Sequence, residues 1–291
     1  MRANAWLASV LAPALASANR TGHLPRRAAM LIRTLRCVVL AVSCALLLPA
    51  AHCALPDEIQ VYTDDINAPG EFGLELHVNT TPRGIRAPGY PGEVVANRGL
   101  RITPEFSYGI TPTIEAGLYL PLVLSGGNWS PAGVKSRLKW LPIKGDAANG
   151  GLYAGANLEL SNTQGKFNAA RHNAELRILL GHRGREWLIG INPIFIWALS
   201  SSQEVPAPRN PQFSLNTRVT RRVTEQVLLG VEYYNSRGTW RRFDPGNEQG
   251  KSLFFIVEVA NKLLPFHFGI GRGLNDATDR LTVKAIFDIP F

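Results

Sequence analysis

The feature that most constrains the fold is the strict alternation of apolar and other residues at the C-terminal end of the chain. Over residues 279–291 every second residue is apolar: Leu281, Val283, Ala285, Phe287, Ile289 and Phe291. The intervening positions are mostly polar and include Thr282, Lys284 and Asp288. A period of two is typical of a β-strand with one apolar face, because successive side chains point to opposite sides. The pattern therefore predicts a terminal β-strand.

The same alternation recurs along the chain and is clearest in residues 71–79, 100–110 and 114–124. Each such segment is close to the roughly 9–11 residues that a tilted strand needs to cross a bilayer. No apolar segment after residue 54 approaches the roughly 18 residues of a helical span. Nine further segments bring the predicted total to about twelve strands: 134–143, 151–161, 173–182, 186–199, 211–222, 226–235, 251–260, 264–274 and 279–291.

An apolar terminal strand that ends on an aromatic residue resembles the sorting signal of bacterial outer-membrane β-barrels. The residues that carry this resemblance are Val283, Ala285, Phe287, Ile289 and Phe291. The resemblance implies an all-β fold, an antiparallel transmembrane β-barrel in the bacterial outer membrane. It also implies that the barrel-assembly machinery is a partner during biogenesis.

The lengths of the links between predicted strands support this fold, because outer-membrane barrels have short periplasmic turns and longer outer loops. The first link, 80–99, is long, and the next is the tight turn 111–113. Long and short links then alternate up to the short last outer loop, 275–278. This order predicts that both ends of the barrel domain, 71–291, lie on the periplasmic side. Residues 55–70 are then predicted to be a short periplasmic segment.

Residues 1–54 read as a leader. Arg33 and Arg36 precede a twelve-residue, mostly apolar run, Cys37–Leu48, and a small-residue exit follows. This order is typical of a cleaved signal peptide, and it predicts export with cleavage near residue 53 or 54. Met30 is an alternative true start. The leader has six arginines and no acidic residue, so the net charge of +9 falls to +3 for the rest of the chain. That balance does not favour nucleic acid as a partner.

The polar faces of the predicted strands carry full charges, which would cost roughly 2–4 kcal/mol each in the middle of a bilayer. They are therefore predicted to face the inside of the barrel. The solvated outer face of a soluble barrel or sandwich predicts the same alternation and remains an alternative. The candidate lumen-lining residues are Lys135, Arg137, Lys139, Glu159, Glu175, Arg177, Arg218, Glu232, Glu258 and Lys284.

The sequence shows no pattern that supports an enzyme, a metal site or a cofactor. All three cysteines lie in the leader, no histidine pair has the H-E-x-x-H spacing, and no G-x-S-x-G motif occurs. Loop 236–250 places Trp240, Arg241, Arg242 and Phe243 together. These residues either contact the phosphates of lipopolysaccharide or form a solvated loop. Outer-membrane lipids and lipopolysaccharide are the expected partners.

Two stretches resemble a known family. Residues 104–124, PEFSYGITPTIEAGLYLPLVL, and 133–141, GVKSRLKWL, resemble the outer-membrane proteins grouped as the "MetA-pathway of phenol degradation" family. The resemblance implies an outer-membrane location and uptake of small aromatic or hydrophobic compounds. Its motifs describe strands and turns, so no catalytic or binding residue is carried over.

These observations predict an outer-membrane barrel that passively conducts small molecules. Eight strands enclose little more than side chains and sixteen leave an aqueous channel, so twelve strands fall between the two. A closed barrel with a structural or envelope-interaction role is therefore the alternative. A lipid-modifying enzyme is a third hypothesis, which would need a serine and a histidine side by side on the outer surface.

Overall fold

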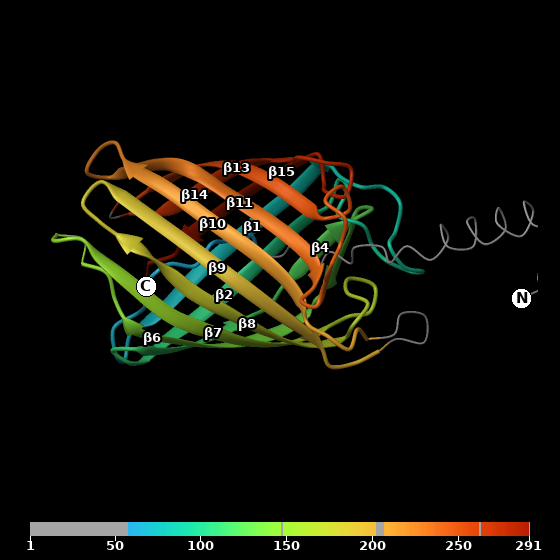
Figure 1. Ribbon diagram of the computed structural model, residues 1–291, viewed down its shortest axis with the longest axis horizontal. Coiled ribbons are helices and arrows are strands. Elements are labelled where there is room, and N and C mark those ends of the chain that lie inside the picture. The colour runs from blue at the N-terminus through green and yellow to red at the C-terminus, as the bar shows by residue number, and fades with distance from the viewer. Residues whose placement is uncertain (1–57, 147, 202–206, 262, 291) are drawn as a thin grey trace, which may run out of the picture. The chain divides into compact units, whose positions relative to one another are not determined.

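The computed structural model describes residues 58–146, 148–201, 207–261 and 263–290. Within them the chain forms a closed antiparallel barrel of twelve strands, whose strands run obliquely around its long axis (Figure 1). The barrel closes because β1 pairs with both β2 and β15. The predicted leader, residues 1–54, lies outside the described residues.

The strands are numbered in chain order and their bounds are as follows: β1 (Phe72–Arg83), β2 (Leu100–Thr111), β3 (Ile114–Tyr119), β4 (Leu122–Ser125), β5 (Asn128–Pro131), β6 (Gly133–Ile143), β7 (Gly151–Thr163), β8 (His172–Arg183), β9 (Trp187–Ala198), β10 (Gln212–Arg222), β11 (Val227–Thr239), β12 (Arg242–Phe243), β13 (Gly250–Val259), β14 (Phe266–Gly273) and β15 (Leu281–Asp288). Among the described residues, no helix is long and apolar enough to span a bilayer.

The prediction of an antiparallel barrel of about twelve strands is confirmed. Each predicted segment corresponds to one place in the strand order around the barrel. Strands β3 and β4 together form the segment predicted at 114–124. That segment is interrupted at Pro121, which has no backbone N–H to donate to a neighbouring strand. Three short strands extend the ring of twelve: β4 continues β3 alongside β2, β5 forms a hairpin with β4, and β12 pairs with β11.

Most buried side chains of the strands are polar or charged and most exposed large ones are apolar, and β6 illustrates this. Leu138 and Trp140 point outward and are 48% and 54% exposed, whereas Arg137 and Lys139 between them point inward and are 5% exposed. A soluble barrel would bury the apolar face and expose the charged one. The barrel therefore has the apolar outer wall and charged interior of a transmembrane β-barrel.

The links at the two ends of the barrel follow the predicted order. Links 84–99 and 240–249 lie at one end, and the turns 112–113, 184–186 and 223–226 lie at the other. At the turn 112–113, the backbone N–H of Thr113 donates to the hydroxyl of Thr111 at 3.2 Å. The C-terminal end of the chain lies at the end with the shorter turns (Figure 1).

The chain before β1 differs from its expected form as a periplasmic segment outside the barrel. Residues 58–70, which we call the inner segment, lie inside the barrel against the side chains of its strands. Val61 is 1% exposed and Tyr62 is 4% exposed. The reason is hydrogen bonding: inward-pointing Lys284, Arg177 and Asn192 all bond to the backbone of the inner segment. Sequence periodicity cannot detect such a segment, because it forms no strand.

Candidate functional site: the charged interior of the barrel

The ten residues predicted to line the lumen, the space enclosed by the barrel, all lie on strands and are largely buried. Their side chains are between 0% exposed, at Glu232 and Lys284, and 32% exposed, at Glu258. The strands that carry them are β6, β7, β8, β10, β11, β13 and β15. Together with the inner segment they form three groups of charges.

The first group joins β2, β3 and β6. The guanidinium of Arg137 lies 2.8 Å from a carboxylate oxygen of Glu105 and 2.6 Å from one of Glu115. The amine of Lys139 lies 3.6 Å from the same oxygen of Glu115. Neither glutamate was among the predicted lumen residues. Alternation in the sequence could have predicted that both point into the lumen, because Glu105 alternates with Phe106 and Glu115 with Ala116.

Gly117 makes room for the first group. It sits opposite Arg137 in the pairing of β3 with β6. A Cβ at this position would lie 2.7 Å from Nε of Arg137, closer than ordinary contact. Glycine at this position therefore lets the guanidinium lie across β3 and reach both carboxylates.

The second group lies on the opposite part of the ring, on β10, β11 and β13–β15. The Lys284 amine bonds to the carboxylate of Glu232 and lies 3.2 Å from the hydroxyl of Tyr234. Tyr234 in turn donates to Glu232 at 2.7 Å. Arg218 forms an ion pair with Glu258. These charges are removed from water and compensate one another.

The third group lies on β6–β8 and reaches the inner segment. Lys135 lies 3.5 Å from Glu159, and Arg177 lies 2.9 Å from Glu175. Arg177 also approaches Glu58 of the inner segment at 4.0 Å. Burial alone would raise the pKa of Glu58, but Arg177 and Lys135 outweigh burial and hold that pKa below its usual value.

The inner segment is held mainly through its backbone. Lys284 donates to the carbonyl of Ile59 at 2.8 Å, Arg177 to that of Gln60 at 3.1 Å and Lys139 to that of Asp65 at 3.0 Å. The amide of Asn192 bonds to both the N–H and the carbonyl of Tyr62, at 2.8 and 3.0 Å. Cations from β6, β8 and β15 thus converge on one stretch of chain.

The ring of Tyr62 is surrounded by cations. Arg177, Lys139 and Arg137 lie 4.5, 5.0 and 5.5 Å from its centre, within reach of a cation–π interaction. Its hydroxyl bonds to that of Tyr119 at 2.7 Å. Burial, with the charges of Glu105 and Glu58, raises the pKa of Tyr62 well above its usual value, so the phenol stays neutral.

A further contact anchors the inner segment near the end with the shorter turns. Arg183 of β8 lies 2.6 Å from Asp64 and 2.8 Å from Asp65. Asp64 also accepts the backbone N–H of Gly145 at 3.0 Å. The inner segment is therefore bonded both in the middle of the lumen and at its rim.

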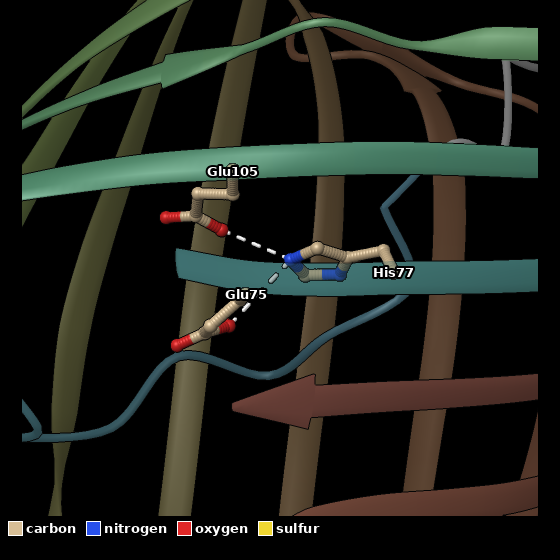
Figure 2. Close-up of side chains that lie close together, drawn as sticks. All are labelled: Glu75, His77 and Glu105. Carbon is tan, nitrogen blue, oxygen red and sulfur yellow. Dashed lines mark hydrogen bonds and ion pairs between the residues drawn. The ribbon is translucent and has the colours of Figure 1, made fainter. Parts of the chain in front are cut away.

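One histidine lies inside the barrel between two carboxylates (Figure 2). The Nε2 atom of His77 is 2.9 Å from a carboxylate oxygen of Glu105 and 3.5 Å from one of Glu75. His77 is fully buried. The sequence analysis did not bring these residues together, because Glu105 lies on a different strand.

The outer wall has a hollow of about 310 Å³ near the end with the longer loops. Ser136, Asn162 and His172 line it together with apolar residues such as Leu160. Strand β7 lies between the strands that carry Ser136 and His172. In the described part of the chain no hydrogen bond joins these two side chains.

The candidate assembly residues lie on the outer side of β15 and just beyond it. Val283, Ala285 and Phe287 are partly exposed and alternate with buried Thr282, Lys284 and Ile286, and Ile289 follows. Phe291 lies outside the described residues. Their role in assembly stays a prediction.

Loop 236–250 folds back onto the outer wall. The backbone N–H of Trp240 donates to the carbonyl of Pro211 at 2.8 Å. The ring of Trp240 lies 5.0 Å from that of Phe195 and 4.8 Å from that of Phe213. Arg241 and Arg242 stay exposed beside these rings.

Solved structures with the same architecture are outer-membrane channels. A crystal structure of the COG4313 outer membrane channel from Pseudomonas putida F1 matches 80% of this chain and 100% of its own, with a TM-score of 0.56 and 10% identity. The fold is that of an outer-membrane β-barrel. The NanC porin matches 76% of this chain and 100% of its own, with a TM-score of 0.50 and 9% identity.

Comparison by sequence adds no family. No protein-family model matches the chain, and no curated protein matches it. The resemblance of residues 104–124 and 133–141 to the phenol-degradation family therefore stays a prediction.

Proposed function

We propose that the chain is an exported protein of the bacterial outer membrane that conducts small molecules passively through its lumen. The observation that carries the proposal is the inner face itself: three groups of paired charges follow the barrel wall around one threaded segment. A barrel that only had to be stable would be served as well by an apolar interior, because buried ion pairs contribute little net stability.

The inner segment occupies the proposed path. Its backbone is held by side chains that can also bond to a passing solute or to water. We infer that the described state is closed or narrow, and that the path opens when the inner segment moves. The likeness to outer-membrane channels supports the fold behind this proposal. The resemblance to the phenol-degradation family favours small aromatic compounds as substrates.

The test is a recording from planar lipid bilayers. Residues 55–291 would be refolded and inserted, with folding confirmed by a heat-modifiable shift on gels. Discrete current steps are expected. Silence from properly folded samples of both residues 55–291 and residues 71–291, which lack the inner segment, would overturn the proposal in favour of the closed structural barrel.

Ion selectivity gives a second test of the same path. Replacing Lys135 and Lys139 by glutamine removes two lumen cations and leaves Arg137 to pair with Glu105 and Glu115. Because the carboxylates remain, the reversal potential in a salt gradient should move toward cation selectivity. Unchanged reversal potentials would show that this wall does not line the path.

Loop 236–250 supports a proposal about the surrounding membrane. Trp240 and Phe243 are exposed apolar rings beside the exposed Arg241 and Arg242. We infer that these residues contact lipopolysaccharide, with the rings near its acyl chains and the guanidinium groups near its phosphates.

A further inference from the structure

We propose that Glu75, His77 and Glu105 form a binding site for a divalent transition-metal ion such as Zn²⁺ inside the barrel. One imidazole nitrogen and two carboxylate oxygens lie within 4.8 Å of one another. Imidazole and carboxylate are ligands that Zn²⁺ accepts in proteins. The inference is independent of whether the lumen conducts.

The pairing of β1 with β2 creates the cluster. Glu75 and His77 are two residues apart on β1, so both side chains point into the barrel. Glu105 on β2 is the direct partner of Glu75 in the register of the two strands. Figure 2 shows the carboxylates of Glu75 and Glu105 on two sides of Nε2 of His77.

The distances suit a metal ion after small movements of the two glutamate side chains. Ligand atoms at about 2.0–2.2 Å from Zn²⁺ lie roughly 3.3–3.6 Å from one another in tetrahedral geometry. Nε2 of His77 is already 2.9 Å from Glu105 and 3.5 Å from Glu75. The side chain of Glu75 is 35% exposed, so it can rotate toward the ion. Its exposure also leaves room for water as a further ligand.

Arg137 serves as an outer partner of the site. It bonds to one carboxylate oxygen of Glu105, at 2.8 Å, while the other oxygen faces His77, where the ion would lie between them. Hydrogen-bonded carboxylates of this kind are usual around metal ligands, because the outer bond fixes their orientation. The positive charge of Arg137 repels a metal cation, but its ion pair with the carboxylate of Glu115 partly compensates that charge.

The second buried histidine of the lumen provides a matched contrast. Nε2 of His267 lies 3.8 Å from one oxygen of Glu232. The amine of Lys284 bonds to the other oxygen of Glu232, and this amine is fully buried beside it. His267 therefore has a single carboxylate partner, Glu232, which already forms an ion pair with Lys284. We expect no metal ion at His267.

The test uses Co²⁺ as a spectroscopic stand-in for Zn²⁺ on untagged, refolded residues 55–291. Ligation by His77 and the carboxylates should give a visible absorption band that saturates at one ion per chain and disappears when Zn²⁺ is added. Ca²⁺, which prefers oxygen ligands, should not displace it. No saturable band from folded protein would overturn the proposal, because the three side chains would then only contact one another.

Variants assign the site. His77→Gln should abolish the band, which would also show that His172 and His182 do not hold the ion. The control His267→Gln should leave the band unchanged. If His77→Gln fails to fold, Glu75→Gln replaces it, because Glu75 is partly exposed and loses only one ligand. The affinity of the Glu75→Gln variant for Co²⁺ should fall by about tenfold or more. An equal band in His77→Gln, or an unchanged affinity in Glu75→Gln, would refute the assignment.

Discussion

Charged side chains inside the barrel have more than one partner each, and this determines how a single substitution acts. Lys284, for example, bonds to Glu232, to the Tyr234 hydroxyl and to the carbonyl of Ile59. Removing one member of such a group leaves the others buried without compensation. Such losses are much larger than the net gain from having the pair.

Lys284→Met should therefore destabilise the barrel by about 3–5 kcal/mol, because Glu232 keeps a buried, unpaired charge. The free energy of unfolding would be measured by urea titration in lipid vesicles. The double variant Lys284→Met with Glu232→Gln should recover part of the loss. If the single variant were as stable as the parent, the ion pair would not be buried as described.

Asn192 helps to keep the inner segment in place, because its amide bonds to the backbone of Tyr62. Asn192→Ala removes two hydrogen bonds to the backbone of Tyr62, worth about 1 kcal/mol each. The ratio of open to closed time in bilayer recordings should rise by a factor of about 5–30. Asn157→Ala is the control, because Asn157 is also fully buried and its amide bonds to no described residue. Equal open times in the two variants would contradict this role.

The residues whose orientation could be predicted from sequence are those for which alternation along a single strand is enough to tell inward from outward. Arg137, Glu232 and Lys284 were placed on polar faces by alternation, and the structure has them pointing inward. The cluster of Glu75, His77 and Glu105 was not found, because it depends on the register between two strands. Register is set by neighbouring strands and turns rather than by either strand alone.

The strands themselves were predictable because most of them repeat one signal, apolar residues outward and polar residues at most inward positions. Where this signal is interrupted, as at Pro121, the structure has two strands, β3 and β4, in place of one. The inner segment has no such signal. Its partners, Asn192 and Lys284, lie more than a hundred residues away in the sequence.

Substitutions on the outer face of β6 test its contact with lipid. Leu138→Arg should destabilise the barrel by about 2–4 kcal/mol, because Leu138 lies near the middle of the strand, whereas Val134→Arg near its end should cost about 0–1 kcal/mol. Urea titration in vesicles measures both. On a soluble surface either change would lie within about 0.5 kcal/mol of zero. A small loss at Leu138 would therefore contradict burial in a membrane.

As a whole, the molecule combines a continuous wall of paired strands with a segment that the wall holds by hydrogen bonds. The wall has continuous pairing around the ring, from β1 through β15 and back. The inner segment adds no strand to it. Its removal should therefore leave the barrel folded while it frees the bonding groups of Lys139, Arg177 and Asn192.

The most direct test compares the single-channel conductance of residues 55–291 with that of residues 71–291, which lack the inner segment. Both would be confirmed as folded by the heat-modifiable gel shift. We predict larger and longer current steps from the shorter chain, because its lumen is no longer occupied. Equal conductance, or silence from the folded shorter chain, would contradict the account of a lumen closed by the inner segment.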